Sequence, residues 1–125
     1  MNDLIADLLA RIQNSIQRKE EKVEVVNTKI NVELLKVLKQ EEMIEDFEIK
    51  EKMIEVVLAY DEKEPVVAHF TRVSKPGQRI YVSRKEIEPV MNGRGISVIS
   101  TPSGLMSGAM AKSKGLGGDL ICKVW

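Results

Sequence analysis

Three hydroxyl side chains lie within one short turn in the stretch ISTPSGLMS, residues 99–107. The residues of the turn itself are Ser100, Thr101, Pro102, Ser103 and Gly104. A hydroxyl group both donates and accepts a hydrogen bond, so it matches the 2′-hydroxyl groups that line the shallow minor groove of an RNA helix. A glycine beside them allows close approach of a second surface. The turn predicts an RNA contact, and the alternative is a turn whose hydroxyls bind only its own backbone.

Catalytic and metal-binding chemistry lacks the side chains that it needs. The single histidine, His69, and the single cysteine, Cys122, lie on separate predicted segments, which excludes both a nucleophile paired with a base and a three-ligand metal site. Cys122 is interpreted as a core residue of the last strand. The glycine cluster at residues 115–118 precedes a strand instead of opening a helix, which is not the dinucleotide-binding pattern. We therefore expect no enzymatic activity, no metal and no cofactor.

Charge divides the chain into two halves of opposite sign. Residues 1–64 carry ten Lys or Arg and sixteen Asp or Glu, whereas residues 65–125 carry nine and three, so the halves have net charges of −6 and +6 in a neutral chain. A basic half is typical of a protein that binds a polyanion such as RNA. The alternative is that the two charged faces attract each other.

The first half is expected to form a small sheet covered by two helices. Asn2 or Asp3 can cap the first helix, and Asn27 or Thr28 can cap the second, because each precedes apolar residues at three- and four-residue spacing. Alternation of apolar and polar residues predicts strands after the second helix. The predicted order is a helix from residue 4, a strand over 23–26, a helix with its apolar stripe over 30–38, and strands over 47–49 and 54–60.

The second half is expected to be mostly antiparallel strand with two short helices. Pro76 and Gly77 have the chemistry of a type II turn, because proline presets φ and glycine accepts a positive φ. Ser83 and Glu86 have the spacing of a capping box, and Ser107 can cap a second short helix. The predicted order is a strand over 66–73, a strand over 80–82, a short helix ending at Pro89, a strand over 96–100, a short helix ending at Gly115, and a closing strand over 119–125.

These elements predict an α+β protein of two small domains, residues 1–64 and 65–125, divided at the polar stretch 61–65 where the charge changes sign. Charged residues Asp3, Asp7 and Arg11 interrupt the first apolar stretch, so we expect no signal peptide and no membrane contact. The protein is expected in the cytoplasm.

The stretch GRGISVISTPSGLMS, with SKPGQRIYV before it and KGLGGDLICKVW after it, resembles the small-subunit ribosomal protein S8 family in its bacterial form. The segments ADLLARIQN and KQEEMI near the beginning are also similar to that family. The resemblance implies a two-domain ribosomal protein that binds the central domain of small-subunit ribosomal RNA early in assembly, beside neighbouring small-subunit ribosomal proteins.

The resemblance also implies which residues contact the RNA. Ser100, Thr101 and Gly104 match the family's hydroxyl turn. Pro102 replaces the usual second serine of that turn, so we expect the contact made there to be lost or to be taken over by Ser103. Further matched positions are Tyr81, Lys75 and Arg79 around the Pro-Gly turn, and Arg11, Asn14 and Lys29 for a second contact. Gln13 and Gln78 stand where basic residues are common, which lowers the expected number of phosphate contacts.

Two other functions stay open at this point. One is a protein-interaction module that uses the oppositely charged halves. The other is translational repression through a messenger RNA that imitates the ribosomal site, which would use the same surface. The free protein is expected to be a monomer.

Overall fold

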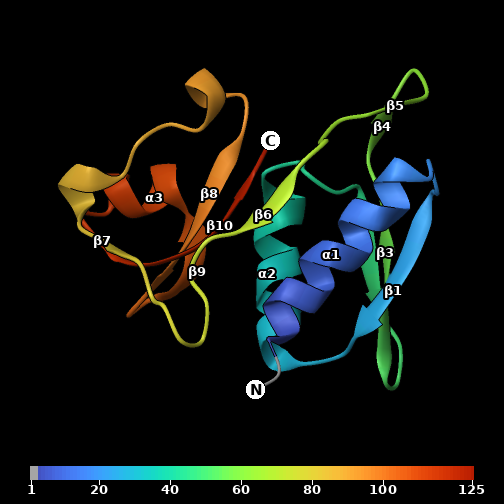
Figure 1. Ribbon diagram of the computed structural model, residues 1–125, viewed down its shortest axis with the longest axis horizontal. Coiled ribbons are helices and arrows are strands. Elements are labelled where there is room, and N and C mark those ends of the chain that lie inside the picture. Colours follow the sequence, from blue (N-terminus) through green and yellow to red (C-terminus); the bar gives the residue numbers. More distant parts are fainter. Residues whose placement is uncertain (1–2) are drawn as a thin grey trace.

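The computed structural model describes residues 3–125 and has two lobes side by side (Figure 1). The N-terminal lobe contains two helices, a three-stranded sheet and a small hairpin. The C-terminal lobe contains a five-stranded sheet, a short helix and two 3₁₀ turns. This mixture of helices and antiparallel sheets confirms the α+β class.

Both long helices begin at a predicted cap. Helix α1, Leu4–Gln17, begins after Asp3, whose carboxylate accepts a hydrogen bond from the Ala6 N–H at 3.1 Å. Helix α2, Lys29–Gln40, begins after Thr28, whose hydroxyl accepts from the Asn31 N–H at 3.2 Å. Each cap satisfies one of the backbone donors that a helix start leaves without a partner. The apolar face of α1 is buried along its length, at Ile5, Leu8, Leu9, Ile12 and Ile16.

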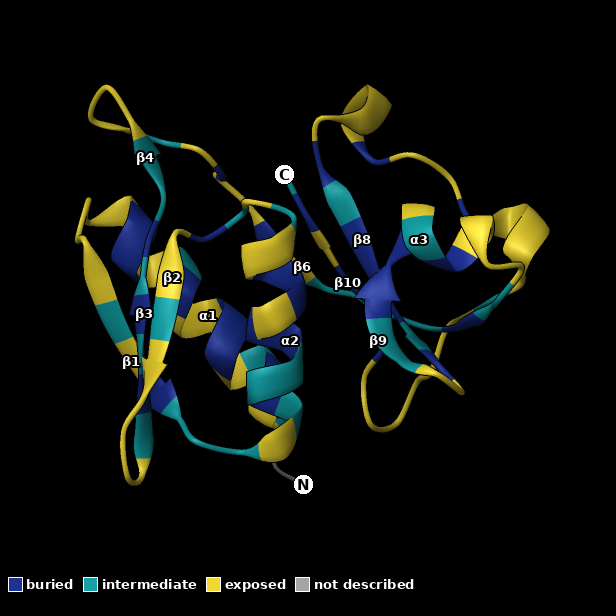
Figure 2. Ribbon diagram, turned by 180° about the vertical axis from the view of Figure 1, so that it is seen from behind, coloured by how far each residue is buried: buried dark blue, intermediate teal, exposed yellow. Residues whose placement is uncertain are grey.

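The sheet of the N-terminal lobe is antiparallel, with the order β1–β3–β2. Its strands are β1, Lys22–Val26, β2, Asp46–Ile49, and β3, Met53–Val57. Alternate residues face opposite sides of a sheet, so the side chains of Val25, Ile54 and Val56 are buried in the core while Glu24, Glu55 and Glu48 lie side by side on the outer face. In Figure 2, exposed residues of this sheet lie on the two outer strands, β1 and β2, whereas the central strand β3 has none.

Two predicted segments differ from the structure at the junction of the lobes. The predicted strand over 54–60 is interrupted after β3, and the polar stretch that follows folds into a hairpin of β4, Tyr60–Asp61, and β5, Glu64–Pro65. Glu62 and Lys63 have φ values of 49° and 71° there, as a tight two-residue hairpin turn requires. The predicted strand over 66–73 is reduced to β6, Phe70–Arg72, because the Ala68 and His69 N–H groups both donate to the Trp125 carbonyl and cannot continue a ladder.

The sheet of the C-terminal lobe is built around its last strand. Strand β10, Gly118–Val124, pairs antiparallel with β8, Ile96–Thr101, on one side and with both β6 and β7, Tyr81–Val82, on the other. Strand β9, Gly104–Ser107, completes the sheet beside β8. The predicted strands over 80–82, 96–100 and 119–125 are thus present.

The turns of this lobe follow their capping residues, with one exception. The capping box holds η1, Arg84–Glu86, through a 2.9 Å bond from the Ser83 N–H to the Glu86 carboxylate, and Ser107 caps α3, Gly108–Ser113. The second 3₁₀ turn, η2, spans Met91–Gly93. Lys75 and Gln78 exchange two backbone hydrogen bonds across Pro76 and Gly77. The φ of Gly77 is not positive, so the prediction of a type II turn is wrong.

One apolar core joins the two lobes. It combines residues of α1 and α2 with Phe70, Val98, Cys122 and Val124 of the C-terminal sheet. A second cluster fills the space between that sheet, α3 and η1. The division into domains at residues 64 and 65 stays a prediction. Across residues 3–125, no helix combines the length and the apolar character that crossing a membrane requires.

Candidate nucleic-acid interface

The hydroxyl turn is the tip of the β8–β9 hairpin, and the Thr101 hydroxyl holds it together. The Thr101 Oγ1 donates to the Gly104 carbonyl at 2.8 Å and accepts from the Ser103 N–H at 3.1 Å. Thr101 is only 8% exposed. Because a hydroxyl has one proton to donate, that of Thr101 has no donor left for a ligand. Gly104 has a φ of +106°, a conformation that favours glycine.

Two hydroxyls of the turn remain available. Ser103 is exposed and Ser100 is partly exposed. Neither side chain makes a hydrogen bond to any other residue that the structure describes. Each of these hydroxyls can therefore both donate and accept toward a bound molecule.

Ser100 belongs to a polar row that crosses three strands. The sheet register pairs Tyr81 of β7 with Asp119 of β10, and Asp119 with Ser100 of β8, so the three side chains share one face. Tyr81 is 68% exposed and presents its ring to solvent. Gly118 precedes Asp119 in β10, and a Cβ at Gly118 would collide with the Ser100 carbonyl. The backbones of β10 and β8 therefore approach closely beside the row.

Asp119 connects this row to a cation. Its carboxylate accepts from the Arg79 guanidinium at 2.6 Å, while the Arg79 side chain stays 71% exposed. The guanidinium is thereby anchored at one nitrogen and has further N–H donors facing solvent. Sequence reasoning missed Asp119, although it is one of only three acidic residues between residues 65 and 125. The signal in the sequence was that Asp119 is the single acidic residue of the predicted closing strand, residues 119–125.

Three predicted contact segments come from the two lobes. The turn over 75–78, the tip of the β8–β9 hairpin and the start of α2 all lie low in the view of Figure 1. Lys75 belongs to the first segment and Lys29 begins α2. The first two segments belong to the C-terminal lobe and the third belongs to the N-terminal lobe.

Arg11 and Asn14 form a separate group on α1. Both are exposed, and their three-residue spacing places them on one face of the helix. The Arg11 Nε also donates to the Asp7 carboxylate at 2.9 Å, which offsets part of its charge. The structure thus does not place these two residues with the hydroxyl turn.

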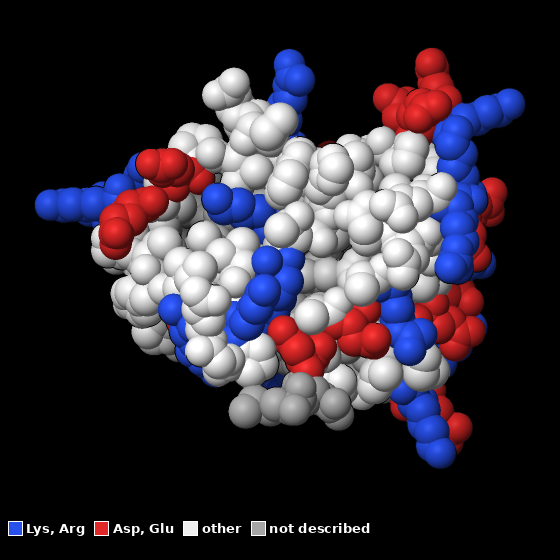
Figure 3. All heavy atoms as spheres, viewed as in Figure 1, with Lys and Arg blue, Asp and Glu red and all other residues white. Residues whose placement is uncertain are grey.

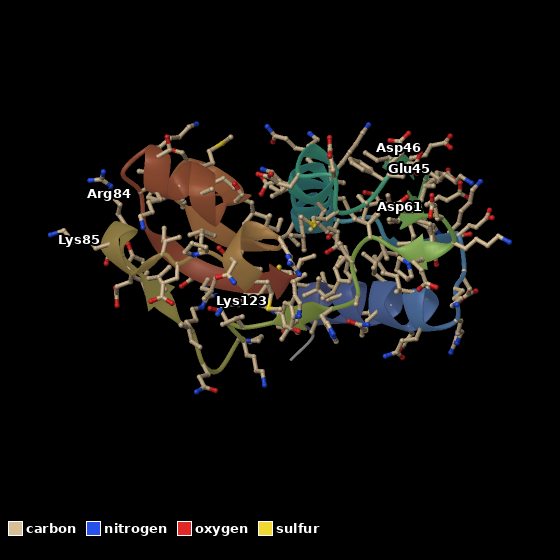
Figure 4. All side chains as sticks on the ribbon, turned by 90° about the horizontal axis from the view of Figure 1, so that it is seen from above. Glu45, Asp46, Asp61, Arg84, Lys85 and Lys123 are labelled. Atoms are coloured by element: carbon tan, nitrogen blue, oxygen red, sulfur yellow. The ribbon has the colours of Figure 1, made fainter. Side chains whose placement is uncertain are left out.

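The difference in net charge between the two halves of the sequence is also a difference between the two lobes of the structure. Six ion pairs join charged side chains within the N-terminal lobe, where red and blue are interleaved in Figure 3. Among the described residues, only Arg72 and Arg79 of the nine cations between residues 65 and 125 form ion pairs. In Figure 4, Arg84 and Lys85 lie at one end of the molecule, and Glu45, Asp46 and Asp61 lie at the other.

Neither reactive residue type forms a catalytic arrangement. Cys122 is buried in the sheet, and desolvation raises the pKa of its thiol to about 12. The His69 ring packs beside Trp125, with ring centroids 5.0 Å apart. Within residues 3–125, no three His, Cys, Asp or Glu side chains are grouped so that they could hold a metal ion.

Comparison with known proteins matches nearly the whole chain to one family. The model of the family described as ribosomal protein S8 matches residues 3–125. This chain belongs to the ribosomal protein S8 family. Proteins named small ribosomal subunit protein uS8 from Caulobacter vibrioides and Geobacter metallireducens are each 42% identical over 130 residues, covering all of this chain and 98% of the relative. The uS8 of Nitratidesulfovibrio vulgaris is 41% identical over 125 residues, covering 99% of that protein.

Membership of the ribosomal protein S8 family confirms the resemblance found in the sequence motifs. It also confirms the predictions of a structural ribosomal protein without enzymatic activity, located with the ribosome in the cytoplasm.

Proposed function

We propose that this protein binds the central domain of small-subunit ribosomal RNA directly and supports the assembly of that domain. The observation that carries the proposal is the row of Tyr81, Asp119 and Ser100, which ends beside a hydroxyl turn and lies among cations with few ion pairs. Hydroxyls and an exposed aromatic ring recognise RNA by its 2′-hydroxyls and unstacked bases, while cations supply affinity for phosphate.

Each residue has a distinct task in this proposal. The Ser100 and Ser103 hydroxyls bind 2′-hydroxyl groups in a minor groove, and Gly104 lets the backbone approach it. Tyr81 stacks on an unpaired base. Lys75 and Arg79 neutralise phosphates, and Thr101 shapes the turn that presents the two serines. Asp119 orients the Arg79 guanidinium.

The N-terminal lobe supplies a second contact through Arg11, Asn14 and Lys29, as the family resemblance implies. Its acidic remainder is available to basic neighbouring proteins of the small subunit. The free protein is a monomer in this proposal, because the interface is complete within one chain.

A salt series with a transcript of the ribosomal central domain tests the proposal. Each neutralised phosphate contributes about 0.7–0.9 to the slope of log affinity against log salt, so Lys75→Gln is expected to reduce the slope by roughly that amount. Lys36→Gln is the matched control, because Lys36 is an exposed cation of α2 outside the predicted interface. Equal slopes for the two variants, or equal affinity for an unrelated RNA duplex, would contradict the proposal.

A further inference from the structure

A single glutamine connects the two lobes through both the nitrogen and the oxygen of its carboxamide. The Gln13 Nε2 of α1 donates to the Ala68 carbonyl at 2.6 Å, and the Gln13 Oε1 accepts from the Phe70 N–H at 2.8 Å. These partners belong to the stretch that leads from the hairpin β4–β5 into β6, which lies beside α1 (Figure 1). The side chain therefore pairs with this stretch as a neighbouring strand would: it donates to Ala68 and accepts from Phe70, two residues further along the chain.

An ion pair makes a second connection between the same two elements. The Arg72 Nε of β6 donates to the Asp3 carboxylate at 3.1 Å, and the Arg72 Nη1 donates to the Ile121 carbonyl at 2.8 Å. Both charged side chains are less than one-fifth exposed. Asp3 and Gln13 are ten residues apart, so the two connections are separated by about 15 Å along the helix axis.

Apolar contacts and these polar contacts constrain the lobes differently. The shared core holds the lobes together, but burial of apolar surface is not directional. Hydrogen bonds need defined distances and angles, so bonds at two separated points resist both sliding and rotation of α1 against β6. Gln13 acts on the connecting stretch itself, whose Ala68 and His69 N–H groups donate to the Trp125 carbonyl, so the stretch is bonded to α1 and to the end of the C-terminal sheet.

We propose that Gln13 is a positioning residue for RNA binding, which fixes the orientation of the lobes so that contact residues of both meet one RNA molecule at once. This inference rests on the proposed function. Two linked contacts raise the affinity only when the linkage lets both of them bind at once. If the lobes already have the orientation that the RNA requires, binding does not have to supply the free energy to order them. Lobes that rotate against each other lose part of that gain without losing any contact residue.

The chemistry of the carboxamide allows its two bonds to be removed separately. Gln13→Glu keeps the acceptor for the Phe70 N–H and loses the donor, whereas Gln13→Lys keeps a donor for the Ala68 carbonyl and loses the acceptor. Gln13→Met is of similar length and keeps neither. Gln17→Met is the matched control, because Gln17 is exposed at the end of the same helix.

The test measures affinity of the full chain for the central-domain transcript and, by residual dipolar couplings of the free protein, the orientation of the lobes. Gln13→Met is expected to bind roughly ten-fold more weakly, a part of the roughly 10²- to 10⁴-fold that linkage can supply. Its couplings should no longer fit one rigid arrangement. The couplings of Gln13→Glu and Gln13→Lys should lie between those of Gln13→Met and those of the unchanged protein. Gln17→Met should match the unchanged protein in both measurements. Affinity is compared for the uncharged variants alone, because Glu or Lys at position 13 changes the charge beside the exposed Arg11 and Asn14.

A general loss of stability is excluded by a second variant. Val25→Ala removes buried volume in the N-terminal sheet, and should lower the melting temperature while leaving affinity unchanged. Unchanged affinity or unchanged couplings in Gln13→Met overturn the inference. If the unchanged protein does not prefer the transcript, the proposed function fails instead, and the couplings still test the role of Gln13 in orienting the lobes.

Discussion

At the scale of residues, the hydroxyl turn separates into a part that builds it and a part that is free to bind. Sequence reasoning grouped Ser100, Thr101 and Ser103 because a hydroxyl has the same chemistry wherever it stands. The structure gives Thr101 two partners inside the turn and leaves the two serines without one among the described residues. Which hydroxyl is internal depends on the turn geometry, which residue type alone does not specify.

This difference predicts that alanine at position 101 lowers stability, whereas alanine at position 103 weakens RNA binding. Thr101→Ala removes both internal bonds and should lower the free energy of unfolding by about 1 kcal/mol. Ser103→Ala should leave unfolding unchanged and weaken binding to the central-domain transcript. Chemical denaturation and filter binding on each variant separate the two effects. Unchanged stability of Thr101→Ala would show that its bonds do not hold the turn.

Gly118 and Gly77 give a second prediction at this scale. An added Cβ at Gly118 meets the backbone of Ser100, whereas one at Gly77 meets nothing within 4 Å. Gly118→Ala should therefore destabilise the protein by about 1–3 kcal/mol, while Gly77→Ala stays within about 0.5 kcal/mol. Thermal unfolding compares them directly. Equal melting temperatures would mean that β8 and β10 separate without cost.

At the scale of elements, local signals predicted what local bonds determine. The caps at Asp3, Thr28 and Ser107 and the capping box at Ser83 and Glu86 involve residues three apart, so the sequence was sufficient. The strand predicted over 66–73 was too long because its first residues bind the carbonyl of the last residue of the chain. No pattern in a short window reveals a partner more than fifty residues away.

The outer face of the N-terminal sheet carries a prediction of its own. Glu24, Glu55 and Glu48 are direct neighbours, and Lys50 lowers the pKa of Glu55 by hydrogen bonding to it. Like charges side by side on a sheet are destabilising, so Glu24→Gln should raise the melting temperature at neutral pH and low salt. The gain should shrink as salt is added, because salt screens the repulsion between charges on an exposed face. Glu33→Gln on α2 serves as the control.

A depressed folded-state pKa gives that same face an acid-sensitive contribution. The ion pair of Glu55 with Lys50 stabilises the protein above the unfolded pKa of a glutamate and is lost as pH falls through the lower folded value. Glu55→Gln should therefore remove part of the acid destabilisation of the unchanged protein. An identical pH dependence of the two melting temperatures would contradict this assignment.

At the scale of the whole molecule, the candidate RNA interface lies on the lobe that carries the net positive charge. The charge difference and the family motifs could be found in the sequence, and the sequence indicated both lobes. The shared core, the connection through Gln13 and the row from Tyr81 to Ser100 could not be found, because they depend on how distant strands and helices meet. The resulting molecule presents its less neutralised half and its free hydroxyls on one lobe.

The central claim is that the tip of the β8–β9 hairpin contacts ribosomal RNA. A photoreactive benzoylphenylalanine placed at position 103, with one at position 62 of the acidic hairpin as the control, tests it in intact small subunits. We predict crosslinks from position 103 to the central domain of the RNA and none from position 62. Crosslinks from position 103 to proteins alone, or equal RNA crosslinking from both positions, would contradict the account.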